Sequence, residues 1–336
     1  MADLTTKYLG LTLPSPIIAG SCGYTASVAD IAKIEESGAG AVVMKSLFEE
    51  EILSELNHAQ AQMNRPGTIY PEIFDFFDYD DMEDTVSKYL FTIEEVKKQV
   101  KIPVIASVNC ISADEWHVFA KRLESAGADA LELNLFILPS DLNRSADENE
   151  KIYFDVLKKV KNDVKIPVSL KISSYFSNLA QMVVNLGEAG ADGIVLFNRF
   201  YSPDIDIDRL EVVPADVLST PADLYNSLRW VAILSGKVKC DLASSTGVHD
   251  GKAAIKQLLA GAHAVQVASA LYKNGIDYIA EINHTIEDWM NEHGFKSVDE
   301  FRGNLSYSNS SNPAAYERVQ FMRHFSGKSC ASIPKW

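Results

Sequence analysis

Paired cysteines and long apolar runs are both missing from this 336-residue sequence. Its cysteines, Cys22, Cys110, Cys240 and Cys330, are scattered and form no CxxC pair. That usage is typical of a reduced cytoplasmic protein and provides no framework for a metal. The opening residues, 1–7, lack the apolar segment of a signal peptide, and no run approaches the length that spans a bilayer. We therefore expect a cytoplasmic protein with no membrane contact and no bound metal.

Positive charge is also scarce. The chain has 31 Lys and Arg residues against 46 Asp and Glu residues, a formal net charge of −15. This balance argues against a nucleic-acid partner, because phosphate backbones attract basic surfaces. The hydrophobic fraction of 47% is ordinary for a globular protein and is enough for a sizeable core. We expect a small-molecule substrate as the partner and no nucleic acid.

One pattern recurs in the chain: a helix that ends in Gly-Ala and is followed by a strand. Glycine can end a helix in a left-handed conformation, and small residues allow a tight return into a sheet. The pattern occupies residues 36–45, 124–134, 188–198 and 259–269. Two further segments, 101–109 and 165–173, both begin Lys-Ile-Pro-Val, and proline fits the first residue of a strand.

Eight apolar segments read as strands separated by helical patterns. The strands are expected at 16–21, 41–46, 103–109, 130–135, 167–172, 193–198, 239–245 and 264–269. Helices are expected at 113–125, 178–188, 252–260 and 276–293. Eight alternating units predict an α/β protein with a (β/α)8 TIM barrel. A doubly wound sheet is the alternative, but Ala19–Gly23 is a weak match to its glycine fingerprint.

Two connections are too long for simple crossovers. Both follow strand ends, so residues 47–80 and 199–220 are expected to cover the barrel mouth as insertions. Residues 201–213 alternate like a strand. We expect one barrel domain over residues 1–305, followed by a tail over 306–336 that contains a short helix at 314–324.

Polar side chains mark the carboxyl ends of the expected strands, where barrel enzymes carry their chemistry. Lys45 and Lys171 imply an anionic ligand, because a buried lysine needs an anionic or polar partner. Asparagine amides could hold a planar heterocycle. These asparagines are Asn109, Asn134 and Asn198. Small and hydroxylated residues end the last two strands at 244–248 and 267–269, where many barrels bind phosphate. Together they predict a cofactor that bears phosphate.

The motifs between residues 9 and 303, and their order along the chain, resemble those of the dihydroorotate dehydrogenase family. The resemblance is strongest to the soluble first class of that family. The motifs include Leu9–Gly20, Lys45-Ser46, 103–108, 121–135 and 266–275. The resemblance implies an FMN-containing (β/α)8 barrel that oxidises dihydroorotate to orotate in pyrimidine biosynthesis. It places the flavin against Ala19, Gly20, Lys45, Ser46, Ser107, Asn109, Lys171, Ser245, Thr246, Gly247, Ala268 and Ser269. It places the substrate against Asn134, Asn198 and the neighbouring Arg199.

The chain departs from this family around the substrate. Where the family has the cysteine that serves as catalytic base, this chain has Phe136-Ile137-Leu138. Ser140 is the candidate base, as serine is in the membrane-associated class, and Lys45 is the other candidate catalytic residue. Asp141, Tyr201, Cys22 and Cys110 are weaker candidates for the base. The asparagine-bearing loop of the family is replaced by residues 67–72.

Three functional hypotheses remain. The first is an FMN-dependent oxidoreductase that acts on a CH–CH group of dihydroorotate or a related small ring. The second is a flavin-binding protein with altered catalysis and a binding or regulatory role. The third is a Schiff-base lyase that uses Lys171. The sequence leaves open the electron acceptor, an electron-transfer subunit and a homodimer.

Overall fold

Eight parallel strands form a closed barrel in the computed structural model, which describes residues 2–48, 85–110, 116–199 and 202–317. In order around the barrel they are β4 (Ala41–Val43), β3 (Ile17–Ala19), β13 (Ala264–Val267), β12 (Asp241–Ser244), β9 (Gly193–Leu196), β8 (Val168–Ile172), β7 (Ala130–Leu135) and β6 (Val104–Cys110). The pairing of β4 with β6 closes the ring, and β5 (Leu47–Phe48) adds to the outer end of β6. The predicted (β/α)8 barrel and the places of its eight strands are confirmed.

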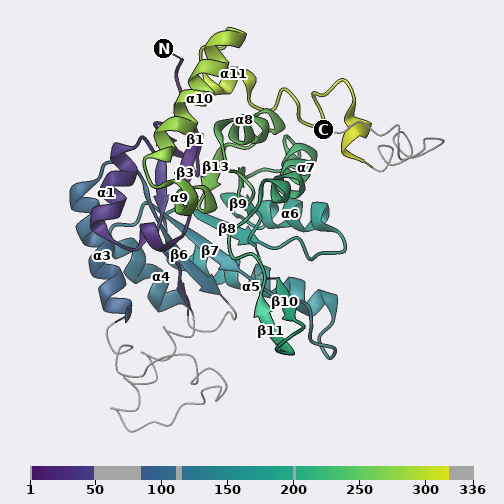
Figure 1. Cartoon of the computed structure of the whole chain (residues 1–336). Helices are drawn as coiled ribbons and strands as arrows, with labels where there is room; N and C mark the ends of the chain where they lie inside the picture. Colours follow the sequence, from purple (N-terminus) through teal and green to yellow (C-terminus); the bar gives the residue numbers. More distant parts are fainter. Residues whose placement is uncertain (1, 49–84, 111–115, 200–201, 318–336) are drawn as a thin grey trace, which may run out of the picture.

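Helices surround the strands on the outside (Figure 1). The α-helices are α1 (Val28–Glu36), α3 (Thr85–Gln99), α4 (Trp116–Ser125), α5 (Ala146–Asp163), α6 (Leu179–Glu188), α7 (Leu224–Leu234), α8 (Gly251–Ala260), α9 (Ser269–Asn274), α10 (Tyr278–His293) and α11 (Val298–Phe301). Short 3-10 helices are η1 (Gly23–Thr25), η4 (Pro221–Asp223) and η5 (Pro313–Tyr316). No helix in the described ranges combines the length and the apolar run that crossing a bilayer takes.

The glycine of each Gly-Ala repeat has the left-handed backbone that the sequence pattern predicted. All of these glycines have positive φ, and they are Gly38, Gly127, Gly190 and Gly261. At Gly261 the conformation ends α8, where the backbone N–H donates to the carbonyl of Gln257. The repeat therefore works as predicted, because each glycine turns a helix back toward the next strand.

An N-terminal hairpin closes the floor of the barrel, which the sequence reasoning did not identify. It consists of β1 (Thr6–Tyr8) and β2 (Leu11–Leu13), paired antiparallel. Leu9 N donates to the carboxylate of Asp241, the first residue of β12, at 2.7 Å. Tyr8 and Leu9 are buried with a small apolar cluster that fills the barrel interior.

The alternating segment contains two strands, within residues 203–214, rather than the single strand that its alternation suggested. In the described part, β10 (Pro203–Asp206) and β11 (Glu211–Pro214) pair as an antiparallel hairpin that projects from the barrel (Figure 1). Leu210 has φ +56° at the turn, which reverses the chain. Residues 217–219 return to the mouth and line a cavity there, so this insertion covers the mouth in part. Residues 49–80 of the other expected cover lie outside the described residues.

The described part of the tail packs back on the barrel. Tyr307 N donates to the carbonyl of Ala232 at 2.8 Å, and η5 follows at Pro313–Tyr316. The expected helix at 314–324 overlaps η5 in its first residues, and its remainder lies outside the described residues. The division into a barrel and a tail stays a prediction.

Candidate functional site

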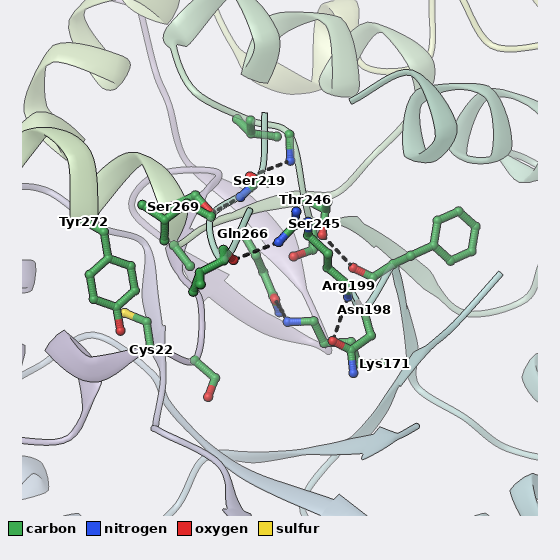
Figure 2. A pocket seen from close by; sticks show the side chains of 17 residues that line it. Cys22, Lys171, Asn198, Arg199, Ser219, Ser245, Thr246, Gln266, Ser269 and Tyr272 are labelled. Carbon is green, nitrogen blue, oxygen red and sulfur yellow. Dashed lines mark hydrogen bonds between the residues drawn. The ribbon is translucent and has the colours of Figure 1, made fainter. Parts of the chain in front are cut away.

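A cavity of about 620 Å³ opens at the carboxyl ends of the strands. Its volume lies in the range of sites for cofactors and drug-sized ligands. Its wall comes from the ends of β3, β8, β9, β12 and β13, and from the segment 217–219 (Figure 2). The lining residues are Ser21, Cys22, Lys171, Phe197, Asn198, Arg199, Val217, Leu218, Ser219, Ser245, Thr246, Gly247, Val248, Gln266, Ala268, Ser269 and Tyr272.

The two segments predicted to bind phosphate meet in this cavity. Ser245, Thr246 and Gly247 follow β12, while Ala268 and Ser269 join β13 to α9, and all of them line the wall. A hydroxyl network joins the two sides through the 217–219 segment. Ser219 N donates to Ser269 Oγ at 3.0 Å, and Gly247 N donates to Ser219 Oγ at 3.3 Å. The cavity therefore has a small, polar wall on the side of the last two strands.

Thr246 and Gly247 both adopt left-handed backbone conformations, with φ of +74° and +80°. For threonine this conformation is unfavourable, because its Cβ crowds the backbone. Thr246 Oγ1 donates to the carbonyl of Phe197 at 3.0 Å, which helps to hold the turn. The turn directs the chain across the cavity wall and brings Gly247 against the start of α7.

Lys171, on β8, also lines the cavity and lies within a buried polar network. Its ammonium donates to Gln266 Oε1 at 2.8 Å and lies 3.5 Å from Glu132 Oε1. Gln266 Nε2 in turn donates to Glu132 Oε2. Exposures are 8% for Lys171, 2% for Gln266 and 1% for Glu132. The sequence predicts that a buried lysine has a polar or anionic partner, and Lys171 has one of each, Gln266 and Glu132.

The predicted substrate asparagines also come together. Asn134 is the penultimate residue of β7 and Asn198 follows β9, and the Asn198 amide donates to Asn134 Oδ1. Arg199 lines the cavity, but its guanidinium already has partners. It donates to the carbonyl of Val217 at 2.7 Å and lies 3.9 Å from the Asp223 carboxylate. Arg199 therefore anchors the 217–219 segment, which forms part of the cavity wall.

Several predicted flavin residues lie beside the cavity rather than on its wall. Ser21 Oγ, which does reach the wall, lies 3.1 Å from Ser46 Oγ, and Ser46 Oγ lies 2.8 Å from Ser107 Oγ. This chain of hydroxyls links the ends of β3, β4 and β6. The other predicted residues in this region are buried Ala19 and Gly20, half-buried Asn109 and exposed Lys45.

The candidate base Ser140 is exposed on the segment after β7 and does not line the cavity. Asp141 is exposed on the same segment. Cys22 does line the cavity, but burial raises the pKa of its thiol. Tyr201 and the side chain of Cys110 lie outside what the structure describes. Of the candidate bases whose side chains the structure describes, only Cys22 lies on the cavity wall. Burial there disfavours its thiolate, the form that accepts a proton.

A second cavity of about 500 Å³ adjoins the first and shares Phe197, Asn198, Arg199, Ser245 and Thr246 with it. Its remaining wall includes Ser173, Tyr175 and other polar residues from the β8 and η4 regions. Arg199 thus lies between the two cavities. Ser245 and Thr246 border both, whereas Gly247, Ala268 and Ser269 line the first alone. The arrangement gives room for two ligands at one barrel mouth.

Sequence reasoning missed several residues of the site. Gln266 and Glu132 complete the Lys171 network, and Ser219 joins the two polar segments. Tyr272 accepts a hydrogen bond from Gly23 N at 2.5 Å, and His249 Nε2 lies 3.1 Å from Ser219 Oγ. Burial, together with the charge of Lys273, lowers the pKa of His249. A signal existed for Glu132, because strand alternation puts it on the side of Asn134.

Fold and site together define a (β/α)8-barrel protein with a lysine and a wall rich in hydroxyl groups at the carboxyl ends of its strands. A family model described as dihydroorotate dehydrogenase matches residues 80–290, well over half of the chain. The chain belongs to the dihydroorotate dehydrogenase family. This family is flavin-dependent in general.

Curated relatives carry the name dihydroorotate dehydrogenase B (NAD(+)), catalytic subunit. The protein of Thermoplasma volcanium is 28% identical over 323 residues, which cover 90% of this chain and 98% of that protein. The protein of Methanothermobacter thermautotrophicus is 29% identical over 314 residues, with coverages of 89% and 97%. The protein of Petrotoga mobilis is 30% identical over 205 residues, with coverages of 60% and 68%.

These comparisons confirm the predicted class, an oxidoreductase of the dihydroorotate dehydrogenase type that acts on a CH–CH group. They do not favour the alternative of a flavin-binding protein with altered catalysis.

Proposed function

We propose that this chain is an FMN-dependent oxidoreductase that removes two hydrogens from a CH–CH bond of a small ring. One observation carries the proposal: Lys171 and the segments 245–247 and 268–269 line the same cavity. An ammonium and a group of small donors on different parts of one wall match a ligand with a phosphate and an electron-accepting ring.

The residues present fit such a cofactor. The cavity has a suitable volume, and Gly247 cannot carry a side chain, which lets the backbone form its polar wall. Ser245, Thr246, Gly247, Ala268 and Ser269 would hold the phosphate. Lys171 would lie against the ring, with Ala19, Gly20, Lys45, Ser46, Ser107 and Asn109 forming the rest of its bed. When bound, the flavin supplies the hydride acceptor.

The protein's own residues then orient the substrate. Asn134 and Asn198 present amide groups from β7 and from the end of β9, the two strands that flank β8, which suits the alternating donors and acceptors of a pyrimidine edge. Arg199 lies between the two cavities and would meet a carboxylate on the substrate only by rearranging its contact with Val217. The second cavity, beside Asn198, is the proposed place of the ring substrate.

We expect L-dihydroorotate to be oxidised slowly by this chain. A positioned base is worth about 10²–10⁴-fold in rate. Phe136, Ile137 and Leu138 stand where the family has its base, and none of them can accept a proton. Ser140, the candidate replacement, is exposed and would have to approach the ring from the segment after β7. We therefore propose that the best substrate is a related ring that differs from dihydroorotate.

The names of the relatives describe catalytic subunits of an NAD⁺-linked enzyme. We therefore propose that electrons leave this chain through a separate electron-transfer subunit. Steady-state assays with NAD⁺, fumarate and a quinone, with and without added reductase fraction, distinguish this route from direct transfer.

The test begins with the visible spectrum and chromatographic identity of the cofactor released from purified, flavin-reconstituted protein. Equimolar FMN is the expected result, and absence of any flavin would refute the proposal. Bound flavin is then mixed anaerobically with L-dihydroorotate and, as a matched donor without the carboxylate, with dihydrouracil. Reduction by dihydroorotate at about 1–10 s⁻¹, an ordinary turnover rate, would show that the expectation of a different substrate is wrong.

A further inference from the structure

Glu132 and Lys171 are the only charged residues that are buried in the described part of the chain. They lie on neighbouring strands, because β7 pairs with β8 in parallel and Asn134 lies opposite Lys171. Burying a carboxylate has a large cost unless it is paired and hydrogen-bonded. The barrel keeps this costly pair of charges directly beneath the cavity wall, and packing alone does not explain why they are there.

The geometry of Glu132 links it to Lys171 in two ways. Its Oε2 accepts a hydrogen bond from Gln266, whose other amide atom accepts from the Lys171 ammonium at 2.8 Å. Its Oε1 has no hydrogen-bond partner and lies 3.5 Å from the same ammonium. Figure 2 shows Gln266 and Lys171 pointing toward one another at the cavity. Gln266 thus holds both charged groups in place.

The negative charge of Glu132 also acts on the barrel interior below it. Burial, and after it the charge of Glu132, raises the pKa of Tyr8 well above its ordinary value. Tyr8 belongs to the floor hairpin, so the charge of Glu132 acts on the floor of the barrel as well as on the ammonium at the cavity. Few mobile charges or waters can screen it there, and its field reaches the ammonium at low effective dielectric.

We propose that Glu132 is a positioning residue that, through Gln266, fixes the Lys171 ammonium and offsets its charge, and thereby sets the electron affinity of the bound flavin. The inference rests on the proposed function. A lysine beside a flavin stabilises negative charge on the reduced ring. A carboxylate 3.5 Å from that lysine weakens the stabilisation, so the pair sets a lower reduction potential than Lys171 alone would give.

The decisive variant is Glu132→Gln, which removes the charge and keeps an acceptor for Gln266. Two quantities are measured on flavin-loaded protein: the reduction potential, by equilibration with a reference dye, and the dissociation constant of sulfite. Sulfite donates its lone pair to oxidised flavin and leaves the ring anionic, so its affinity reports nearby positive charge. We expect a more positive potential and sulfite binding that is tighter on the order of tenfold.

Two further variants separate positioning from a general structural effect. Lys171→Met should loosen sulfite binding, and Glu132→Gln placed on top of it should then tighten binding less than it does in the wild-type background, because the part of the effect that acts through the position of the lysine is lost. Cys240→Ala is the matched control, since it alters a buried, uncharged side chain just before β12 that lines neither of the two cavities. It should leave both quantities unchanged.

Glu132→Asp provides a second line of evidence if the glutamine variant does not fold. It keeps the negative charge but moves it away from Lys171. We therefore expect a smaller shift of the reduction potential and of the sulfite affinity, in the same direction as for Glu132→Gln. If flavin-loaded Glu132→Gln or Glu132→Asp has the wild-type potential and sulfite affinity, this inference is wrong but the proposed function still stands. A wild-type protein that holds no flavin would overturn the proposed function together with it.

Discussion

Gly247 is the residue on which the shape of the cavity wall depends most directly. A Cβ atom at this position would lie 2.1 Å from Leu224 N and 2.6 Å from the carbonyl carbon of Asp223. Those atoms belong to the backbone at the start of α7, so a side chain could be accommodated only by moving that helix. The left-handed φ of +80° adds a conformational cost for any other residue.

We therefore predict that Gly247→Ala lowers the free energy of unfolding by about 2–5 kcal/mol, the sum of overpacking and backbone strain. Gly236→Ala is the matched control, because Gly236 has φ +75° but no atom within 4 Å of its added Cβ. It should lose only about 1–2 kcal/mol from strain. Urea unfolding of both variants makes the comparison, and equal losses would show that the contact with α7 is tolerated.

At the scale of elements, the two Lys-Ile-Pro-Val segments are connected in the same way. Before β6, Glu35 accepts hydrogen bonds from Lys101 N and Ile102 N at 2.6 and 2.9 Å. Before β8, Glu124 accepts from the N–H groups of 165 and 166 at 2.9 and 3.2 Å. In each case a glutamate from the preceding repeat unit satisfies N–H groups that the following proline leaves outside the ladder.

A second carboxylate, from an aspartate, accepts a hydrogen bond at the start of both β6 and β8. Asp129 accepts from Val104 N at 2.7 Å and forms an ion pair with Lys97 at 2.6 Å. Asp192 accepts from Val168 N at 2.7 Å and forms an ion pair with a lysine of α5, also at 2.6 Å. The start of β8, the strand that carries Lys171, is thus fixed by two carboxylates.

We predict that Glu124→Ala lowers the free energy of unfolding by about 1–3 kcal/mol, because two backbone N–H groups lose their acceptor. Glu124→Gln keeps an acceptor oxygen and should lose clearly less. Glu35→Ala tests the equivalent position before β6 and should resemble Glu124→Ala. Chemical denaturation of the three variants measures the differences. Equal losses for the alanine and glutamine variants at 124 would contradict a role as hydrogen-bond acceptor.

The elements that sequence reasoning placed correctly are those with a strong local signal. The strands of the barrel are continuous apolar segments between a Gly-Ala turn or a proline and a polar residue, so their positions could be read directly. The β1–β2 hairpin has strands of three residues, too short for periodicity to reveal. In the β10–β11 hairpin the alternation continues through the turn, so one strand was expected where two exist.

The candidate site was predictable to the same degree. Polar residues at strand ends could be expected to converge, because all parallel strands end at one face of a barrel. Asn134 and Asn198 do meet, as do the segments 245–247 and 268–269. The partners of Lys171 could not be chosen from the sequence. Gln266 lies 95 positions away, and its contact depends on the closure of the barrel.

For the whole molecule, the two ends of the barrel serve different purposes. The cavity and the residues proposed to face the substrate lie at the carboxyl ends of the strands, and the β1–β2 hairpin closes the opposite end. Thr6 Oγ1 donates to the carbonyl of His263 before β13, and Arg302 donates to Thr6 Oγ1 at 3.0 Å. The floor therefore ties the N-terminus to the last barrel strands and to the segment after α11.

Tyr8 is the largest side chain of this floor and is fully buried among the interior residues of the barrel. We predict that Tyr8→Ala lowers the free energy of unfolding by about 3–5 kcal/mol, the usual loss for a buried aromatic side chain. Lys7→Ala, on the exposed side of the same strand, should have little effect. Urea unfolding compares the two variants.

Tyr8→Ala also tests whether the floor of the barrel affects the cavity at its other end. Tyr8 is buried and close enough to Glu132 to be affected by its charge, so its removal would open a void into which water can enter near that carboxylate. Water there would screen Glu132 from Lys171, so flavin-loaded Tyr8→Ala should bind sulfite more tightly, in the direction expected for Glu132→Gln but to a smaller extent. Tyr8→Phe keeps the ring and fills the space, and it should retain wild-type sulfite affinity. A destabilised Tyr8→Ala protein with unchanged sulfite affinity would instead show that the floor supports stability alone.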